Sequence, residues 1–179
     1  MVKYARLLLL VVILCTFISF GFNAQCGPNN YEPENNITLA ELTDGSEYWN
    51  NWTNTAALKN KAKELARVSI QYHEYIENEY DCNDMAIDIW NMLAKDEITS
   101  IIVIGDLDED GETFADCNHA WLAILNQTSN DVVTIYALEP TNGEIYPYTG
   151  KETDPNRKYF EGFFYAKPSD MRTDLGDRW

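Results

Sequence analysis

Residues 81–95 read DCNDMAIDIWNMLAK, and this stretch predicts a helix that opens with a cysteine. Asp81 is a favoured N-cap residue, and Asp84 adds negative charge in the first turn. The apolar residues recur at intervals of four, three and four positions, so they share one face; they are Cys82, Ala86, Ile89 and Leu93. The thiol of Cys82 is therefore expected on the core-facing stripe, within the turn where the helix dipole favours a thiolate.

The elements predicted on either side of this helix define the fold class. An apolar stripe at helical spacing begins at about Thr55 and predicts an earlier helix. Runs rich in β-branched and aromatic residues predict later strands over residues 99–104, 118–125, 132–138 and 159–166. Because the helices come first and hairpin-linked strands follow, we expect an α+β fold with the Cys-bearing helix packed on an antiparallel sheet.

The N-terminus is predicted to be a targeting segment. Lys3 and Arg6 precede an uncharged apolar run, so residues 1–22 are typical of a signal peptide, with an uncleaved membrane anchor as the alternative. The remainder of the chain is then extracytoplasmic, either secreted or anchored by that segment. Residues 23–54 are rich in Asn, Glu, Pro and Gly, and they are predicted to be an irregular lead-in to one domain at residues 55–179.

The chain is strongly acidic, with 29 acids, 13 bases and a formal net charge of -16 over 179 residues. Such a charge repels nucleic acid and anionic membrane surfaces. We therefore expect no nucleic-acid partner, and membrane contact only through the N-terminal segment if it is retained. A solvated acidic surface explains the charge, and recruitment of cationic substrates is the alternative.

A thiolate nucleophile needs a histidine as ion-pair partner and base, and His119 opens the strand predicted at residues 118–125. If the following hairpin loop is centred on Ser129, Glu139 lies directly opposite His119 on the same face, with the Cβ atoms about 5 Å apart. A carboxylate there orients the imidazole, so Cys82, His119 and Glu139 are predicted to form a catalytic triad. Trp121 follows the predicted base and is expected to wall the cleft, with core packing as the alternative.

Three pieces of the chain resemble the transglutaminase-like superfamily of papain-like cysteine enzymes. They are Asp81-Cys82-Asn83-Asp84-Met85-Ala86, His119-Ala120-Trp121 and Leu138-Glu139-Pro140-Thr141, in the order of that family's motifs. The resemblance spans roughly residues 70–145 and implies a papain-like core. It also implies thiolate chemistry on peptide or amide bonds through an acyl-enzyme, released to water or an amine, with no cofactor required. Glu139 departs from the family, which usually has Asp at this position.

Acyl transfer also needs donors for the developing oxyanion. The backbone N–H of Cys82 is one expected donor, and Tyr80 or Asn78 is a candidate for another. Because the family signature for this donor is missing and Glu replaces Asp, a catalytically inactive module is the alternative function. Such a module binds a peptide or glycan at the cell surface without cleaving it. A peptide or protein is the expected substrate of the enzyme.

Two sets of residues in the sequence are candidate metal sites. The run Asp106-Leu107-Asp108-Glu109-Asp110-Gly111 resembles the start of a calcium loop, which makes Asp106, Asp108 and Asp110 candidate ligands. An acidic surface loop is the alternative, and a calcium-dependent adhesion or structural domain is the function that this site favours. Zinc bound by Cys82, Cys117 and His119 is a further possibility, although the chain lacks paired CxxC or HxxxH spacing.

The cysteine count bears on which thiol is reactive. Cys15 lies in the predicted signal, so an odd number of cysteines remains: Cys26, Cys82 and Cys117. An odd number in an oxidising compartment leaves one thiol free. A bridge between Cys26 and Cys117 leaves Cys82 available for chemistry, whereas a bridge between Cys82 and Cys117 makes it structural.

Overall fold

The structure is a computed structural model that describes residues 33–77, 79–108, 113–128, 133–149, 151 and 153–176. The predicted signal or anchor at residues 1–22 lies outside the described residues, as do residues 23–32 of the predicted lead-in. Within the described part of the chain, none of the helices combines the length and apolar character that a bilayer span needs.

The two main helices are α3 (Thr55–Tyr72) and α4 (Cys82–Lys95). The side chain of Asn54 caps α3 by accepting from the N–H of Ala57. Asp81 caps α4 by accepting from the N–H of Asn83 at 3.0 Å. Helix α4 therefore begins where the sequence predicts, with Cys82 as its first helical residue.

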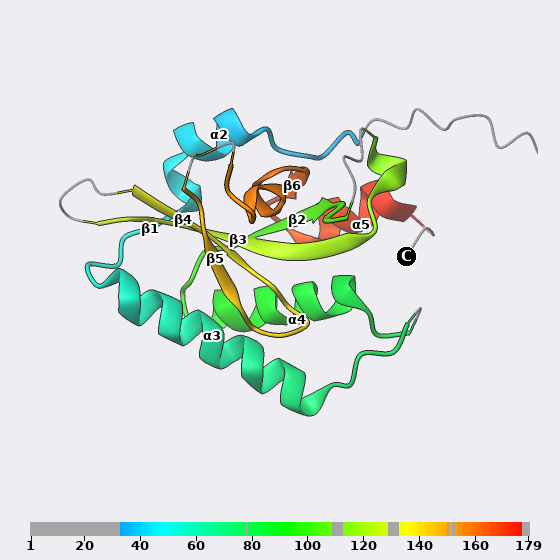
Figure 1. Ribbon diagram of the computed structural model, residues 1–179, viewed down its shortest axis with the longest axis horizontal. Helices are drawn as coiled ribbons and strands as arrows, with labels where there is room; N and C mark the ends of the chain where they lie inside the picture. The colour runs from blue at the N-terminus through cyan, green and yellow to red at the C-terminus, as the bar shows by residue number, and fades with distance from the viewer. Residues whose placement is uncertain are drawn as a thin grey trace, which may run out of the picture.

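The described residues form a sheet of six strands. The strands are β1 (Trp49–Asn50), β2 (Ile101–Gly105), β3 (His119–Gln127), β4 (Val133–Leu138), β5 (Ile145–Pro147) and β6 (Phe163–Tyr165). They lie in the order β5-β4-β3-β2-β6 with antiparallel neighbours, and β1 pairs in parallel with β3. The fold is α+β with a mostly antiparallel sheet, as the sequence predicts (Figure 1).

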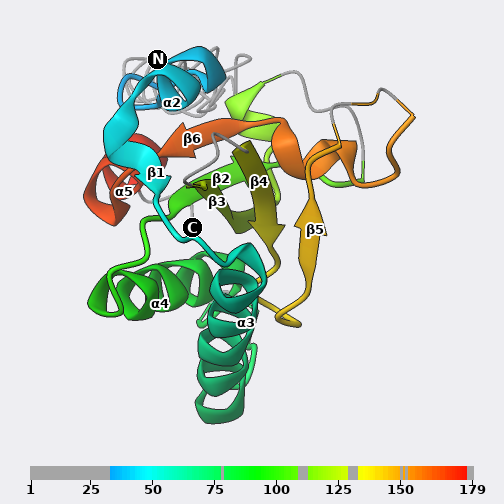
Figure 2. The same cartoon turned by 90° about the vertical axis from the view of Figure 1, so that its left-hand side faces the viewer.

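The two faces of the sheet carry separate cores. Helices α3 and α4 cover one face, while the short helix α2 (Leu39–Asp44) lies on the opposite face (Figures 1 and 2). On the helical side, apolar residues of both helices pack against alternate residues of the central strand, Ala120, Leu122 and Ile124. On the other side, Trp121 and Leu125 pack with Leu42 of α2. The alternation along β3 thus decides which core each side chain joins.

The predicted irregular lead-in is ordered where the structure describes it. Besides α2, it contains a 3-10 turn, η1 (Ser46–Tyr48), and strand β1, in which Trp49 pairs with Leu125 of β3. Leu42 is 1% exposed, so this segment belongs to the core of the domain, which starts before residue 55. The elements are too short to produce a helical or strand period, which explains why composition alone predicted a lead-in. The C-terminal helix α5 (Pro168–Leu175) was not predicted either.

Candidate active site

Helix α4 and strand β3 bring Cys82 and His119 together. Cys82 is 5% exposed and packs in the core between the helices and the sheet. His119 is the first residue of β3, where it pairs with Gly105 of β2. The side chain of Cys82 lies close enough to the imidazole of His119 to raise the pKa of that imidazole, so the first two residues of the predicted triad are neighbours.

The third predicted residue, Glu139, also reaches His119, but through a different strand register. Leu122 pairs with Leu138 across β3 and β4, so continuation of this register places Glu139 opposite Trp121. The predicted hairpin centre at Ser129, a residue outside the described part, is therefore displaced. His119 and Glu139 are diagonal neighbours on one face, because a shift of two residues preserves the face. Glu139 Oε2 nevertheless lies 2.8 Å from His119 Nε2.

The turn between β4 and β5 fixes the position of Glu139. The N–H of Glu139 donates to the carbonyl of Glu144, and the N–H of Gly143 donates to the carbonyl of Glu139, both at 2.9 Å. Gly143 adopts a φ of 72°, a left-handed conformation that glycine tolerates best. Lys63 of α3 holds the turn from outside through its ion pair with Glu144 at 2.9 Å. Glu139 is thus anchored by its backbone as well as by its side chain.

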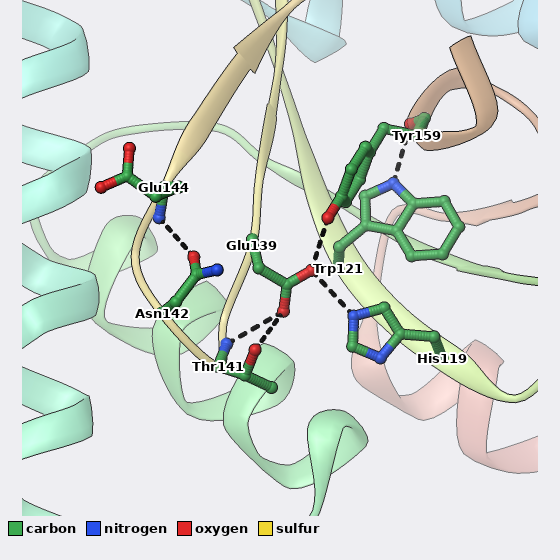
Figure 3. Close-up of polar contacts among 7 residues, drawn as sticks. All are labelled: His119, Trp121, Glu139, Thr141, Asn142, Glu144 and Tyr159. Atoms are coloured by element: carbon green, nitrogen blue, oxygen red, sulfur yellow. Dashed lines mark hydrogen bonds and ion pairs between the residues drawn. The ribbon is translucent and has the colours of Figure 1, made fainter. Parts of the chain in front are cut away.

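The carboxylate of Glu139 is surrounded by hydrogen-bond donors (Figure 3). Oε1 accepts from the N–H and the hydroxyl of Thr141, at 3.1 and 2.7 Å. Oε2 accepts from the hydroxyl of Tyr159 at 3.2 Å and contacts His119. Only an ionised carboxylate offers acceptor sites on both oxygens for so many donors. Burial alone raises the pKa of Glu139, but the bonds to His119 and Thr141 outweigh it and leave that pKa below its ordinary value.

His119 is correspondingly biased toward its protonated form. Burial lowers the pKa of His119, but the interactions with the side chains of Cys82 and Glu139 raise it to about 9. The His119 side chain is 19% exposed, so these contacts are only weakly screened by solvent. Because Nε2 is occupied by Glu139, Nδ1 is the ring nitrogen left for the sulfur.

Two aromatic residues support the triad. Tyr159, which sequence reasoning did not assign to the site, belongs to the 3-10 turn η3 (Arg157–Phe160) and stacks on Tyr146 at 4.5 Å. Trp121 was expected to wall the cleft, but it is 0% exposed and therefore a core residue. Its ring stacks on His119 at 5.9 Å, and its Nε1 donates to the carbonyl of Tyr159 at 2.8 Å. Trp121 therefore packs against the imidazole of His119 and hydrogen-bonds the backbone of Tyr159.

The structure describes two of the three expected oxyanion donors, Tyr80 and the amide of Cys82. Asn78 lies outside the described residues. The hydroxyl of Tyr80 donates to Asp88 at 2.7 Å, so the structure directs that proton to α4 and not to a substrate. The amide of Cys82 belongs to the first turn of α4, where helical N–H groups have no partner within the helix. Tyr75 is 50% exposed. Partial burial raises the pKa of its phenol, and the nearby charge of Cys82 raises that pKa further.

Cys117 is the second thiol in the described part of the chain. Cys82 and Cys117 are both free thiols, so the bridge between these two residues is absent, whereas Cys26 lies outside the described residues. Burial, together with the charges of Asp106 and Asp116, raises the pKa of Cys117 to about 12.

The structure describes only part of the predicted calcium loop. Asp106 accepts from the N–H of Asp108 at 2.8 Å, while Asp110 lies outside the described residues. Among the residues that the structure describes, no three His, Cys, Asp or Glu side chains converge as a metal ion would need. The proposed zinc ligands Cys82, Cys117 and His119 therefore do not gather into one site.

Comparison with known proteins adds no assignment: no family model matches the chain, and no curated protein or solved structure is detectably similar to it. The function must therefore be inferred from the chemistry of the site itself.

Proposed function

We propose that this chain is an exported thiol enzyme, of transglutaminase-like type, that acts on peptide or amide bonds. Cys82 is the nucleophile, His119 transfers protons and Glu139 orients the imidazole. The observation that carries the proposal is that the Nε2 atom of one imidazole lies 2.8 Å from a buried, fully engaged carboxylate, while the side chain of Cys82 lies close enough to the same imidazole to raise its pKa. This is the nucleophile, base and orienting group that covalent acyl transfer requires.

In the acylation step, the Cys82 thiolate attacks the carbonyl carbon of the amide and forms a tetrahedral intermediate. The amide N–H of Cys82 is in position to donate to the oxyanion from the first turn of α4. His119 then gives its Nδ1 proton to the leaving amine, the C–N bond breaks and a thioester remains on Cys82. Because the pKa of His119 is raised to about 9, the imidazole holds that proton throughout the neutral range.

In the second step, water or an amine attacks the thioester carbonyl carbon. His119, now neutral, takes a proton from the attacking group, and the sulfur leaves as the thiolate. The product is a carboxylic acid when water attacks and a new amide when an amine attacks. Glu139 keeps its charge throughout and stabilises the imidazolium each time that it forms.

The reactivity of Cys82 is the direct test. With iodoacetamide near pH 7, the mature protein should be alkylated fastest at Cys82, as followed by peptide mass mapping. His119→Ala should slow this labelling roughly 10-fold or more, because the cation that favours the thiolate is lost. The control is Cys117, whose pKa is raised to about 12 and whose labelling should be slow and indifferent to His119→Ala. Labelling of Cys82 at the rate of an ordinary thiol, unchanged by His119→Ala, contradicts the proposal.

A catalytically inactive module that binds peptide or glycan is the second candidate. The observation that favours it is the hydroxyl of Tyr80, which donates to Asp88 and leaves one predicted oxyanion donor unavailable. A binding module should retain its affinity in Cys82→Ala and form no thioester with an activated ester substrate. Detection of a covalent acyl adduct on Cys82 by intact-protein mass spectrometry excludes this candidate.

A further inference from the structure

Three Asn-x-Thr triplets in the chain have the sequence of acceptors for N-linked glycans. They begin at Asn36, Asn51 and Asn126. An N-linked glycan is bulky and hydrophilic, so in a folded protein it is carried only by an asparagine whose amide faces solvent. The structure describes all three asparagines, and they differ in their accessibility.

The side chain of Asn126 belongs to the interior of the domain. Asn126 is 0% exposed in strand β3, and its Oδ1 accepts from the N–H of Trp52 at 3.0 Å. Its Nδ2 donates to the carbonyl of Trp52 at 3.1 Å and to the hydroxyl of Thr55 at 3.3 Å. A glycan on Nδ2 would replace a proton of this buried network and has no room in a close-packed interior.

Asn36 is half-buried, and the residues of its triplet already have structural roles. The Nδ2 of Asn36 donates to the carbonyl of Pro33 at 3.3 Å. Ile37 pairs with Phe164 in an isolated bridge, and the hydroxyl of Thr38 belongs to the capping box of α2. A glycan on Asn36 would therefore compete with contacts that order the segment before α2.

Asn51 combines the acceptor triplet with an exposed position. It follows β1 in the irregular connection to α3, and both Asn51 and Thr53 are exposed. The backbone of this connection is fixed by the bonds between Trp52 and Asn126, while the Asn51 side chain is left at the surface. We infer that Asn51 is a site of N-linked glycosylation and that the glycan projects into solvent from the β1–α3 connection.

The position of this connection keeps the glycan away from the candidate active site. Figure 1 shows the connection between β1 and α3 at one end of the molecule, and the segment that leads into α4 at the other end. Cys82 is the first residue of α4, so it lies at that other end. A glycan on Asn51 therefore leaves the approach to the thiol uncovered.

The modification joins Asn51 to an oligosaccharide that the host supplies on a polyprenyl diphosphate lipid. Asn51 Nδ2 bonds to the anomeric carbon of the first sugar, while the bond from that carbon to the diphosphate oxygen breaks. The diphosphate lipid leaves with the electron pair, and the Nδ2 proton passes to a base of the host transferase. The inference rests on the proposed function only for export, because the transfer takes place on the extracytoplasmic side of the membrane.

The experiment expresses the full chain in a eukaryotic cell line that secretes glycoproteins and treats the secreted protein with peptide N-glycosidase F. The treatment should lower the apparent mass on a gel and convert Asn51 to aspartate, which peptide mass mapping locates. Asn51→Gln and Thr53→Ala should each abolish the mass shift. Thr53→Ser is the matched control and should keep it, because serine also completes the triplet. Asn36→Gln should leave the shift unchanged as well.

The outcomes separate this inference from the proposed function. Secreted protein without a glycan overturns the inference, as does a glycan on Asn36 or Asn126 with Asn51 unmodified. Retention of the unglycosylated chain in the cytoplasm overturns both the inference and the proposed export. A glycan on Asn51, together with alkylation of Cys82 at the rate of an ordinary thiol, supports the inference while the proposed enzyme activity fails.

Discussion

Glu139 contacts His119 across a diagonal of the sheet, because the β3–β4 register places Trp121, and not His119, opposite Glu139. Diagonal neighbours in an antiparallel pair are separated by about 7 Å, which is more than the spacing of residues directly opposite. The longer side chain of glutamate spans this separation and brings Oε2 to 2.8 Å from Nε2. The family that the chain resembles usually has Asp at this position. The longer side chain of Glu139 therefore suits the diagonal geometry of this sheet.

The first prediction concerns the length of that side chain. In Glu139→Asp the charge is kept but the carboxylate withdraws by one methylene, so contact with His119 is weakened. The alkylation rate of Cys82 near pH 7 should fall by roughly 10-fold, since the cation beside the sulfur is less favoured. Thr141→Ala serves as the control, because it removes a donor to Oε1 but leaves Oε2 on His119. A rate for Glu139→Asp equal to that of the unmodified protein argues against a diagonal contact.

The parts of the site that the sequence predicts are those set by local chemistry. An N-cap at Asp81 and the apolar period of residues 82–93 define where α4 begins and which face carries Cys82. The face shared by His119 and Trp121 follows from strand alternation alone. These features depend on neighbours in the chain, so they need no knowledge of tertiary contacts.

The parts that the sequence does not predict depend on distant contacts. A hairpin register is set by the turn, and residues 129–132 contain no Asn-Gly or Asp-Gly pair to fix the turn type. The predicted pairing of β3 with β4 was therefore displaced by two residues from the observed one. Tyr159 was assigned to a strand at residues 159–166 because of its aromatic character, whereas the structure has η3 there and β6 only at Phe163–Tyr165. Thr141 belongs to the motif Leu138-Glu139-Pro140-Thr141, and its hydroxyl, two residues after Glu139, is a sequence signal for the bond to Oε1.

The second prediction concerns Tyr159, whose hydroxyl donates to Glu139 Oε2 at 3.2 Å. Tyr159→Phe keeps the stack on Tyr146 and the backbone bond from Trp121, so only the donor is lost. Urea denaturation should show that the free energy of unfolding falls by about 1.5–3 kcal/mol, the range for a hydrogen bond to a charged group. Tyr148→Phe, at an exposed position whose ring contacts Phe160, is the control and should change the stability little. Equal stability of the two variants shows that Tyr159 does not support the carboxylate.

The third prediction is a loss of stability in mild base. The folded pKa of His119 is about 9 and its ordinary value is 6.5, so the protonated group stabilises the fold fully below pH 6.5. This contribution, on the order of 3 kcal/mol, is lost as the pH rises from about 6.5 through 9. Urea denaturation at pH 6.5 and 9.5 measures the loss, and His119→Gln should remove most of it. A fall of the same size in His119→Gln assigns the pH dependence to other groups.

The last prediction tests whether the indole of Trp121 positions the imidazole of His119. A Cβ added at Gly105 would lie 2.6 Å from Trp121 Cη2, and Trp121 is fully buried, with its Nε1 bonded to Tyr159. Gly105→Ala should therefore cost about 1–3 kcal/mol by overpacking, and it should displace the indole that stacks on His119. Slower alkylation of Cys82 should accompany the lower stability.

Gly176→Ala separates these two effects. Gly176 has a φ of 58° and nothing within 4 Å of an added Cβ, so alanine there introduces backbone strain without a clash. It should cost about 1 kcal/mol and leave the labelling rate of Cys82 unchanged. If Gly105→Ala loses stability but keeps the full labelling rate, then Trp121 packs the core without positioning the imidazole. Loss of both properties in Gly105→Ala, and of stability alone in Gly176→Ala, places Trp121 in the support of the triad.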